Sequence, residues 1–310
     1  RYPGCLGEVF LANGEILKER HEKTPILAFS HKKLHDVLLT VQFLLCREYP
    51  MPRHTVMAQG GLFSGMYVYR DWIPDLFKRW PLRVFSLWFS NRMGGALARF
   101  FHAMDFNPVY RRFRDVPSRR VYESNRFAGR QLSGLSYEEF MVFTRHETES
   151  SINTVMRHIL EENRQLIVFP EGKYQHSGEI IRLNRFLMKI AGDSSHPVMT
   201  VSFSYDELCP DFFGRIDACM SPAIVGPDRR AALTAKTAEA LQNNTVIVAS
   251  PLIAIILLGH ESHTREQFAR RIQSLANQAA AAGLLIDPRL ESYDFCKERL
   301  SRFLARRKLA

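Results

Sequence analysis

The chain has 310 residues, 46% of them hydrophobic, which is enough to bury one large core together with a smaller appended unit. This composition excludes disordered and fibrous classes of protein. The formal net charge of +10 indicates an anionic partner, so nucleic acid, an anionic membrane surface and phosphate-bearing substrates are the candidates. Because the sequence begins at Arg1 and its first residues lack a secretory signal, we expect a fragment whose membrane anchor or further domain could precede it.

Five scattered cysteines, with no C-x-x-C pair, argue against a disulfide framework or a zinc ribbon. A reducing compartment fits this pattern best.

Strand-like and helix-like segments alternate through the first two thirds of the chain. Residues 24–30 form an apolar run typical of a buried strand, and an apolar helical pattern covers 37–45. Further strands are predicted at 55–58, 106–110, 165–169 and 198–205, and a helix is predicted at 150–163. This alternation predicts an α/β fold with a mostly parallel central sheet flanked by helices.

Beyond residue 226 the pattern becomes helical. Residues 228–241, 264–282 and 293–309 each predict a helix. We therefore expect an α/β core over 1–225 and a helical C-terminal extension over 226–310.

Two segments bear on membrane association. The apolar run 246–258 is shorter than the roughly 20 residues that cross a bilayer, and Pro251 interrupts it, so it does not predict a spanning helix. Residues 72–101 mix tryptophan and phenylalanine with lysine and arginine, a composition suited to the lipid headgroup boundary. A core helix pair with solvated basic faces explains the same composition.

A histidine and an aspartate five positions apart form the first chemical motif. His31 follows the strand predicted at 24–30, and Asp36 follows His31 by five residues. On a straight helix these side chains would point about 140° apart, so His31 must lie in a loop before the helix if the two are to meet. A carboxylate that holds one imidazole nitrogen leaves the other free to accept a proton from a hydroxyl.

The second motif is Phe169-Pro170-Glu171-Gly172, at the end of the strand predicted at 165–169. Gly172 permits a turn and a close approach of the backbone. Glu171 would stand at the carboxyl edge of the sheet, where open α/β folds bind their ligands.

These two motifs, in this order, resemble those of the lysophospholipid and glycerol-3-phosphate acyltransferase family. The hallmarks of that family are H-x-x-x-x-D and F-P-E-G. Two further blocks of the family are similar to Phe106–Arg111, with its P-V-Y-R, and to His196–Tyr205. The resemblance covers residues 21–224, and the apolar tail at 249–258 is more similar to the glycerol-3-phosphate branch than to the shorter lysophosphatidate branch.

The resemblance implies direct transfer of a fatty acyl group from a thioester to a hydroxyl in phospholipid biosynthesis. It implies that His31 is the general base and that Asp36 orients it, with no acyl-enzyme, no metal and no cofactor. Glu171, Gly172, Arg111 and Lys173 would bind the acceptor and its phosphate. Where the family has an arginine shortly after E-G, this chain has Lys173-Tyr174-Gln175-His176, so Lys173 would supply a point charge without the fork of arginine. Ser177 and Tyr205 are interpreted as structural, the latter with a hydrated hydroxyl.

The implied partners are acyl-CoA or acyl carrier protein, glycerol 3-phosphate or a lysophospholipid, and an anionic membrane surface on its cytoplasmic face, with no nucleic acid. Three alternatives stay open. His31, His35 and Asp36 could form part of a metallohydrolase site, although Lys32 and Lys33 would repel a cation. A nucleic-acid-binding module fits the charge but lacks a recognisable motif. A non-catalytic lipid-binding protein fits the departure after Gly172.

Overall fold

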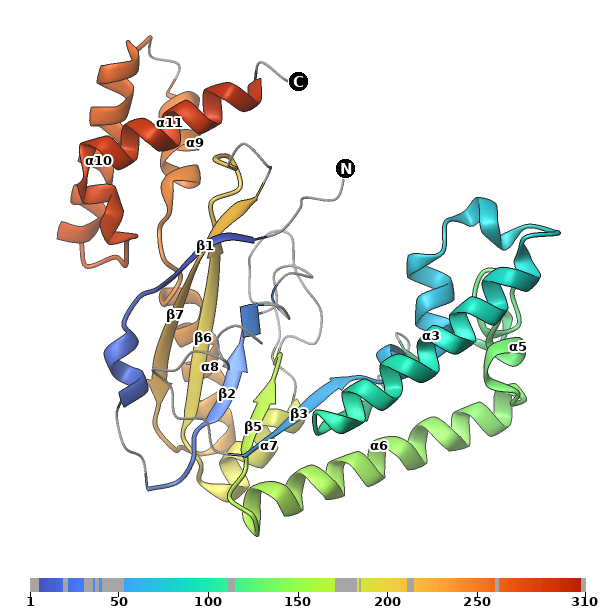
Figure 1. Ribbon diagram of the computed structural model, residues 1–310. Coiled ribbons are helices and arrows are strands. Elements are labelled where there is room, and N and C mark those ends of the chain that lie inside the picture. Colours follow the sequence, from blue (N-terminus) through green and yellow to red (C-terminus); the bar gives the residue numbers. More distant parts are fainter. Residues whose placement is uncertain are drawn as a thin grey trace. The chain divides into compact units, whose positions relative to one another are not determined.

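A computed structural model describes residues 6–18, 22–30, 36, 39–40, 53–110, 115–170, 183, 185–210, 215–259 and 262–307. The chain divides into two compact units (Figure 1). The first unit comprises Arg1–Glu22, Leu27–Pro50 and Phe169–Ala310. The second comprises Lys23–Ile26 and Met51–Val168.

Four strands of the first unit lie in the order β1-β7-β6-β2. Their bounds are Leu6–Leu11 for β1, Ile216–Val225 for β7, Val198–Tyr205 for β6 and Ile26–Phe29 for β2. β1 pairs with β7 in parallel, whereas β6 and β7 are antiparallel. Every residue of β2 and β6 is buried, as expected for strands covered on both faces.

Three strands of the second unit lie in the order β5-β3-β4 and pair in parallel. β3 spans His54–Gln59, β4 spans Phe106–Val109 and β5 spans Gln165–Val168. The buried hydroxyl of Thr55 on β3 accepts a hydrogen bond from Asn107 Nδ2 at 2.9 Å.

Helices make up most of the remainder of the second unit. They comprise the short segments η2 (Gly60–Phe63), α2 (Gly65–Tyr67), η3 (Val68–Trp72) and η4 (Asp75–Lys78), then α3 (Arg83–Ala103), α4 (Arg119–Tyr122), α5 (Gly129–Ser133) and α6 (Tyr137–Leu160). α6 begins with a capping box, in which Ser136 and Glu139 satisfy each other's backbone N–H groups.

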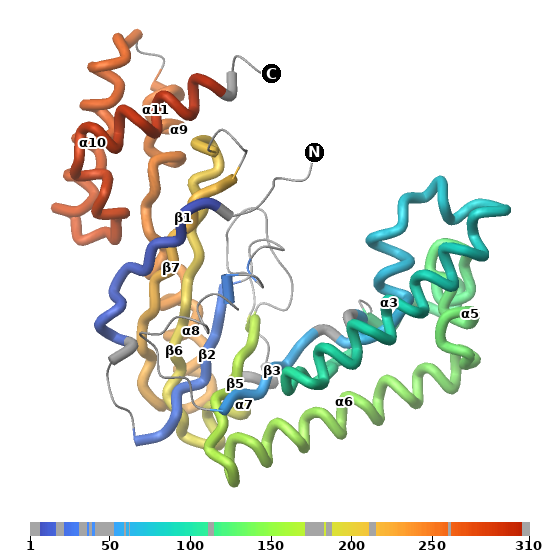
Figure 2. The backbone as a smooth tube through the Cα atoms, viewed as in Figure 1, coloured from blue at the N-terminus to red at the C-terminus, as the bar shows by residue number. Residues whose placement is uncertain are grey.

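In the first unit, the helices for which the structure gives both ends are η1 (Gly14–Lys18), α7 (Arg185–Ser194), α8 (Arg230–Asn243), α9 (Ala249–Leu258), α10 (Arg265–Ala281), η5 (Pro288–Glu291) and α11 (Tyr293–Arg307). Figure 2 shows α9, α10 and α11 gathered at one end of this unit. They share an apolar core that includes Ile253, Ile272 and Leu300. Burying these apolar side chains stabilises the three-helix group.

The predicted α/β fold is confirmed, with a mostly parallel arrangement of strands, flanking helices and a helical C-terminal part. The strands predicted near 24–30, 55–58, 106–110, 165–169 and 198–205 correspond to β2, β3, β4, β5 and β6. β1 and β7 were not predicted, and α6 begins 13 residues earlier than the helix expected at 150–163. The helix predicted over 37–45 lies largely outside the described residues. The boundary predicted between 225 and 226 falls inside the first unit and stays a prediction.

The apolar run 246–258 contributes α9, which buries Leu252, Ile253 and Ile256 in the core it shares with α10 and α11 and exposes Ile255 and Leu258. Among the residues that the structure describes, no helix combines the length and apolar character needed to cross a bilayer.

Candidate functional site

Asp36 is the predicted site residue that the structure describes in detail. It is helical and fully buried, seven residues after β2 ends. The hydroxyl of Thr40 donates a hydrogen bond of 2.8 Å to the Asp36 backbone carbonyl, one helical turn away. Burial of a carboxylate is unfavourable unless polar groups compensate for the lost hydration. The hydrogen-bond partners of the Asp36 carboxylate therefore indicate its role.

Tyr205, the last residue of β6, supplies such a partner. Its hydroxyl is buried and donates a hydrogen bond to Asp36 Oδ1. Burial raises the pKa of Tyr205, and the negative charge of Asp36 raises it further. The phenol therefore stays protonated and keeps donating throughout the physiological pH range. The prediction that Tyr205 is a strand residue is confirmed, but the prediction of a hydrated hydroxyl is wrong, because that hydroxyl is buried against the carboxylate of Asp36.

Contacts between β2 and β6 fix the end of β2. The Ser30 amide donates to the Val201 carbonyl at 2.9 Å, and the Ser30 hydroxyl accepts from the Phe203 amide at 2.9 Å. The rings of Phe29 and Phe203 stack with centroids 5.7 Å apart. The strand that precedes the H-x-x-x-x-D motif is thus locked in register on the strand that carries Tyr205.

The first residue of the F-P-E-G motif lies beside the same strand end. The ring of Phe169 is 6.1 Å, centroid to centroid, from that of Phe29. Phe29 precedes His31 by two residues, and Phe169 precedes Glu171 by two residues. The segments that contain the two motifs therefore begin close together in space, although Phe29 and Phe169 are 140 residues apart in the sequence.

The remaining predicted site residues, His31, Arg111, Glu171, Gly172 and Lys173, lie outside the described residues, as does Ser177. The structure pairs Asp36 with Tyr205 and, as a separate contact, places Phe169 beside Phe29. Sequence reasoning missed the pairing of Tyr205 with Asp36. Its only signal in the sequence was the position of Tyr205 at the end of an apolar strand.

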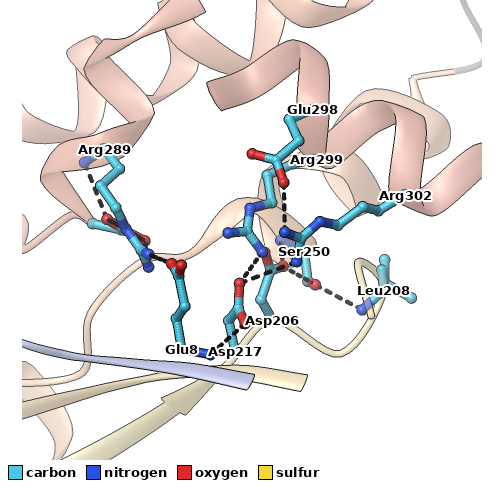
Figure 3. A network of polar contacts seen from close by, with 10 residues as sticks. Glu8, Asp206, Leu208, Asp217, Ser250, Arg289, Glu298, Arg299 and Arg302 are labelled. Carbon is cyan, nitrogen blue, oxygen red and sulfur yellow. Dashed lines mark hydrogen bonds and ion pairs between the residues drawn. The ribbon is translucent and has the colours of Figure 1, made fainter. Parts of the chain in front are cut away.

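A second cluster of buried charges begins at Asp206, the residue that follows β6 (Figure 3). Asp206 Oδ1 accepts a hydrogen bond from the Ser250 amide at 2.9 Å, at the start of α9. Arg299 of α11, which is 1% exposed, forms ion pairs with Asp217 on β7 and, at 3.6 Å, with Asp206. Arg302 also reaches Asp217, at 3.3 Å. This cluster joins the sheet to the C-terminal helices of the same unit.

Tyr205, the last residue of β6, and Asp206, the residue that follows it, therefore belong to two separate carboxylate clusters. The ion pair between Asp206 and Arg299 joins the end of this strand to α11.

The cysteines that the structure describes do not have the properties of nucleophiles. Cys209, Cys219 and Cys296 are buried thiols. Burial raises the pKa of Cys296 to about 11 and that of Cys219 to about 12, so both are protonated at neutral pH. A protonated thiol is a poor nucleophile.

Within the described ranges no group of three or more histidine, cysteine, aspartate or glutamate side chains is arranged to hold a metal ion. His31 and His35, which the metallohydrolase alternative requires, lie outside those ranges.

Neither a protein-family model nor a curated protein matches the chain. Among solved structures, the chain is similar to the crystal structure of the 1-acyl-sn-glycerophosphate (LPA) acyltransferase PlsC from Thermotoga maritima, with 15% sequence identity and a TM-score of 0.38. That likeness covers 83% of this chain and 75% of the other. At this identity and TM-score, the function has to be argued from the residues of the chain itself.

Proposed function

We propose that this chain is a glycerolipid O-acyltransferase, which moves a fatty acyl group from a thioester carrier to a hydroxyl group. The observation that carries the proposal is the buried carboxylate of Asp36, which accepts a hydrogen bond from Tyr205 and follows His31 by five residues. A general base is oriented by a carboxylate that accepts a hydrogen bond from one of its ring nitrogens, and the proposed reaction gives Asp36 this role toward His31.

The position of Phe169 against Phe29 supports the proposal, because it starts the F-P-E-G segment beside the segment that contains His31. A base and a substrate-binding loop that leave neighbouring points of a sheet can reach one bound molecule.

In the proposed reaction, His31 takes the proton from the acceptor hydroxyl as its oxygen attacks the thioester carbonyl. A carbon–oxygen bond forms, the carbon–sulfur bond breaks, and the imidazolium returns the proton to the departing thiolate. Asp36 stabilises the imidazolium, and Tyr205 acts as a positioning residue for Asp36. Proton transfer of this kind contributes about 10²- to 10⁴-fold to the rate.

Recognition of the acceptor phosphate is assigned to Arg111 and Lys173, with Glu171 and Gly172 shaping the loop. Arginine grips a phosphate with two parallel hydrogen bonds, whereas lysine acts as a point charge. The net charge of +10 favours the approach of an anionic acceptor.

At the finer level, the proposed donor is acyl-CoA or acyl carrier protein. The proposed acceptor is glycerol 3-phosphate or a lysophospholipid such as 1-acylglycerol 3-phosphate, with the glycerol-3-phosphate branch favoured by the sequence of the apolar tail. The reaction requires no cofactor, because the thioester supplies the driving force. The proposed location is the cytoplasmic face of a membrane, with no nucleic acid as partner.

The test is an acyl transfer assay on the purified chain with acyl-CoA or acyl carrier protein as donor. Glycerol 3-phosphate and lysophosphatidate serve as acceptors, and glycerol serves as the control that lacks a phosphate. We expect turnover with a phosphorylated acceptor, little with glycerol, and no loss of activity after treatment with EDTA. Absence of transfer to both phosphorylated acceptors, or activity that EDTA abolishes, would contradict the proposal.

A further inference from the structure

All three tryptophans of the chain lie exposed in one short stretch of the second unit. Trp72 is 51% exposed, Trp80 is 81% exposed and Trp88 is 56% exposed. Tryptophan is highly buried on average in soluble proteins, so three exposed tryptophans within 17 residues require an explanation. The interpretation of residues 72–101 as a core helix pair does not fit these exposures.

Other large apolar side chains around the tryptophans are exposed as well. The set is Leu76, Phe77, Leu82, Val84, Phe85 and Phe100. We call these six residues and the three tryptophans the aromatic surface. Figure 1 shows η4 and the first half of α3 at the end of the second unit that is remote from β3 and β5. An exposed apolar patch of this kind marks an interaction site.

The helix α3 buries small residues and exposes large ones, the reverse of an ordinary surface helix. Its buried residues are Ser86, Ser90 and Gly94, spaced one helical turn apart. They allow backbone contact with α2, because a Cβ atom built on Gly65 would lie 2.6 Å from the Ser90 carbonyl oxygen. Val84, Phe85 and Trp88 point away from that contact and are exposed. Close packing through small residues with large apolar residues outward is typical of helices that face lipid.

The charges around the aromatic surface are predominantly positive, and the two carboxylates between residues 70 and 104, Asp71 and Asp75, form ion pairs with Arg70 and Lys78. From residue 76 to residue 104 the sequence contains Lys78, Arg79, Arg83, Arg92 and Arg99, and no aspartate or glutamate. Arg79, Arg92 and Arg99 are exposed. Arg92 and Arg99 lie on the exposed face of α3, because residues 88, 92 and 99 recur at helical spacing.

We propose that the aromatic surface docks on the face of an anionic phospholipid bilayer. Tryptophan and phenylalanine enter the boundary between headgroups and acyl chains, while the arginines contact lipid phosphates. Because α3 is not apolar enough to span a bilayer, it lies along the surface instead of crossing it. This inference goes beyond acyl transfer and does not depend on it.

Charge complementarity is the reason for assigning a membrane as the occupant. An anionic leaflet attracts basic segments near its surface by about 1 kcal/mol per lysine or arginine. A second copy of this chain would bring the same arginines against one another, which opposes self-association through this surface.

The three tryptophans provide an intrinsic reporter for the test. The full chain is mixed with vesicles of phosphatidylglycerol and phosphatidylcholine, or of phosphatidylcholine alone, without any acyl donor. We expect a blue shift of the tryptophan emission and protection from acrylamide quenching with the anionic vesicles, both reversed by high salt. Co-sedimentation with the vesicles measures the partition coefficient independently of fluorescence.

Matched variants locate the contact. Changing Leu76, Trp80 and Phe85 to Gln should lower the partition coefficient into anionic vesicles by at least about tenfold, since each side chain loses apolar burial. The control changes Val142 and Leu160 to Gln; both are exposed residues of α6 in the same unit, and binding should be retained. Changing Arg79, Arg92 and Arg99 to Gln should remove the preference for anionic over neutral vesicles. Far-ultraviolet circular dichroism checks that each variant is folded.

Two outcomes would overturn the proposal. One is that the triple apolar variant binds anionic vesicles as tightly as the unmodified chain. The other is that the chain ignores vesicles but forms dimers that the same variant disrupts, which would assign the surface to a second copy. Because no acyl donor is present, failure of acyl transfer has no effect on either readout.

Discussion

Two buried carboxylates in the first unit are held in different ways. Asp217 forms ion pairs with Arg299 and Arg302, which neutralise its charge and join β7 to α11. Asp36 accepts a hydrogen bond from the hydroxyl of Tyr205, which orients the carboxylate. Breaking a buried ion pair is strongly destabilising, which gives Asp217 a structural role, whereas the proposed role of Asp36 is to act on a histidine.

The largest expected effect is at the structural carboxylate. Changing Arg299 to Met removes the cation from a buried pair and should lower the free energy of unfolding by about 3–5 kcal/mol. Urea unfolding measures this change. Arg302→Met is the matched control, with a smaller loss because the Arg302 side chain is 24% exposed. At low temperature, where Arg299→Met is folded, acyl transfer should persist. An unchanged unfolding midpoint would remove the distinction between the two carboxylates.

The next effect is at the carboxylate assigned to catalysis. Asp36→Asn keeps the shape of the side chain and an oxygen that accepts from Tyr205, but it loses the negative charge. We expect a fall in kcat of about 10²-fold or more, or about 2.7 kcal/mol, with the unfolding midpoint nearly unchanged. Steady-state kinetics and urea unfolding on the same sample separate the two readouts. Normal turnover would place Asp36 with the structural carboxylates.

Tyr205→Phe tests the hydrogen bond to Asp36 through the pH dependence of the free energy of unfolding. The pKa of Tyr205 is raised by burial and by Asp36, so above pH 10 a tyrosine releases its proton in the unfolded chain while Tyr205 in the folded chain retains it. The unfolded state then binds fewer protons, and the native state loses up to about 1.4 kcal/mol of stability per pH unit. Tyr205→Phe should lose less stability than the unmodified chain between pH 10 and 11. Equal slopes in urea unfolding would argue against a buried Tyr205.

The smallest expected effect is the loss of a helix cap, which serves as a reference for the other variants. Thr264 caps α10, where its hydroxyl accepts from the Gln267 amide at 3.3 Å. Thr264→Ala should lower the free energy of unfolding by about 1 kcal/mol without touching either carboxylate. Turnover at low temperature should equal that of the unmodified chain. Loss of turnover in this variant would mean that any destabilisation of the C-terminal helices reduces catalysis, so turnover could not separate the two carboxylates.

Much of the fold could be predicted from local patterns. Buried strands such as β2 and β6 are continuous apolar runs, and the C-terminal helices have clear apolar periodicity. β7 was not predicted because Asp217 and Pro222 interrupt its apolar pattern. In the fold, Asp217 forms an ion pair with Arg299, and Pro222 lies opposite Val201 of β6.

The site was less accessible to prediction. The spacing of His31 and Asp36 was visible, but the bond between Asp36 and Tyr205 joins residues 169 positions apart. A contact of that separation depends on strand order, which no local pattern in a single sequence specifies. Likewise, the composition of residues 72–101 left two interpretations open, and the exposure of Trp80 and its neighbours contradicts the core helix pair.

The central claim is that His31 acts as the base that Asp36 orients. The most direct test measures acyl transfer to a phosphorylated acceptor by His31→Ala, with His35→Ala as the matched control in the same segment. We predict a loss of about 10²- to 10⁴-fold for His31→Ala and near-normal turnover for His35→Ala. Normal turnover in folded His31→Ala, or equal losses in both variants, would contradict the proposed mechanism.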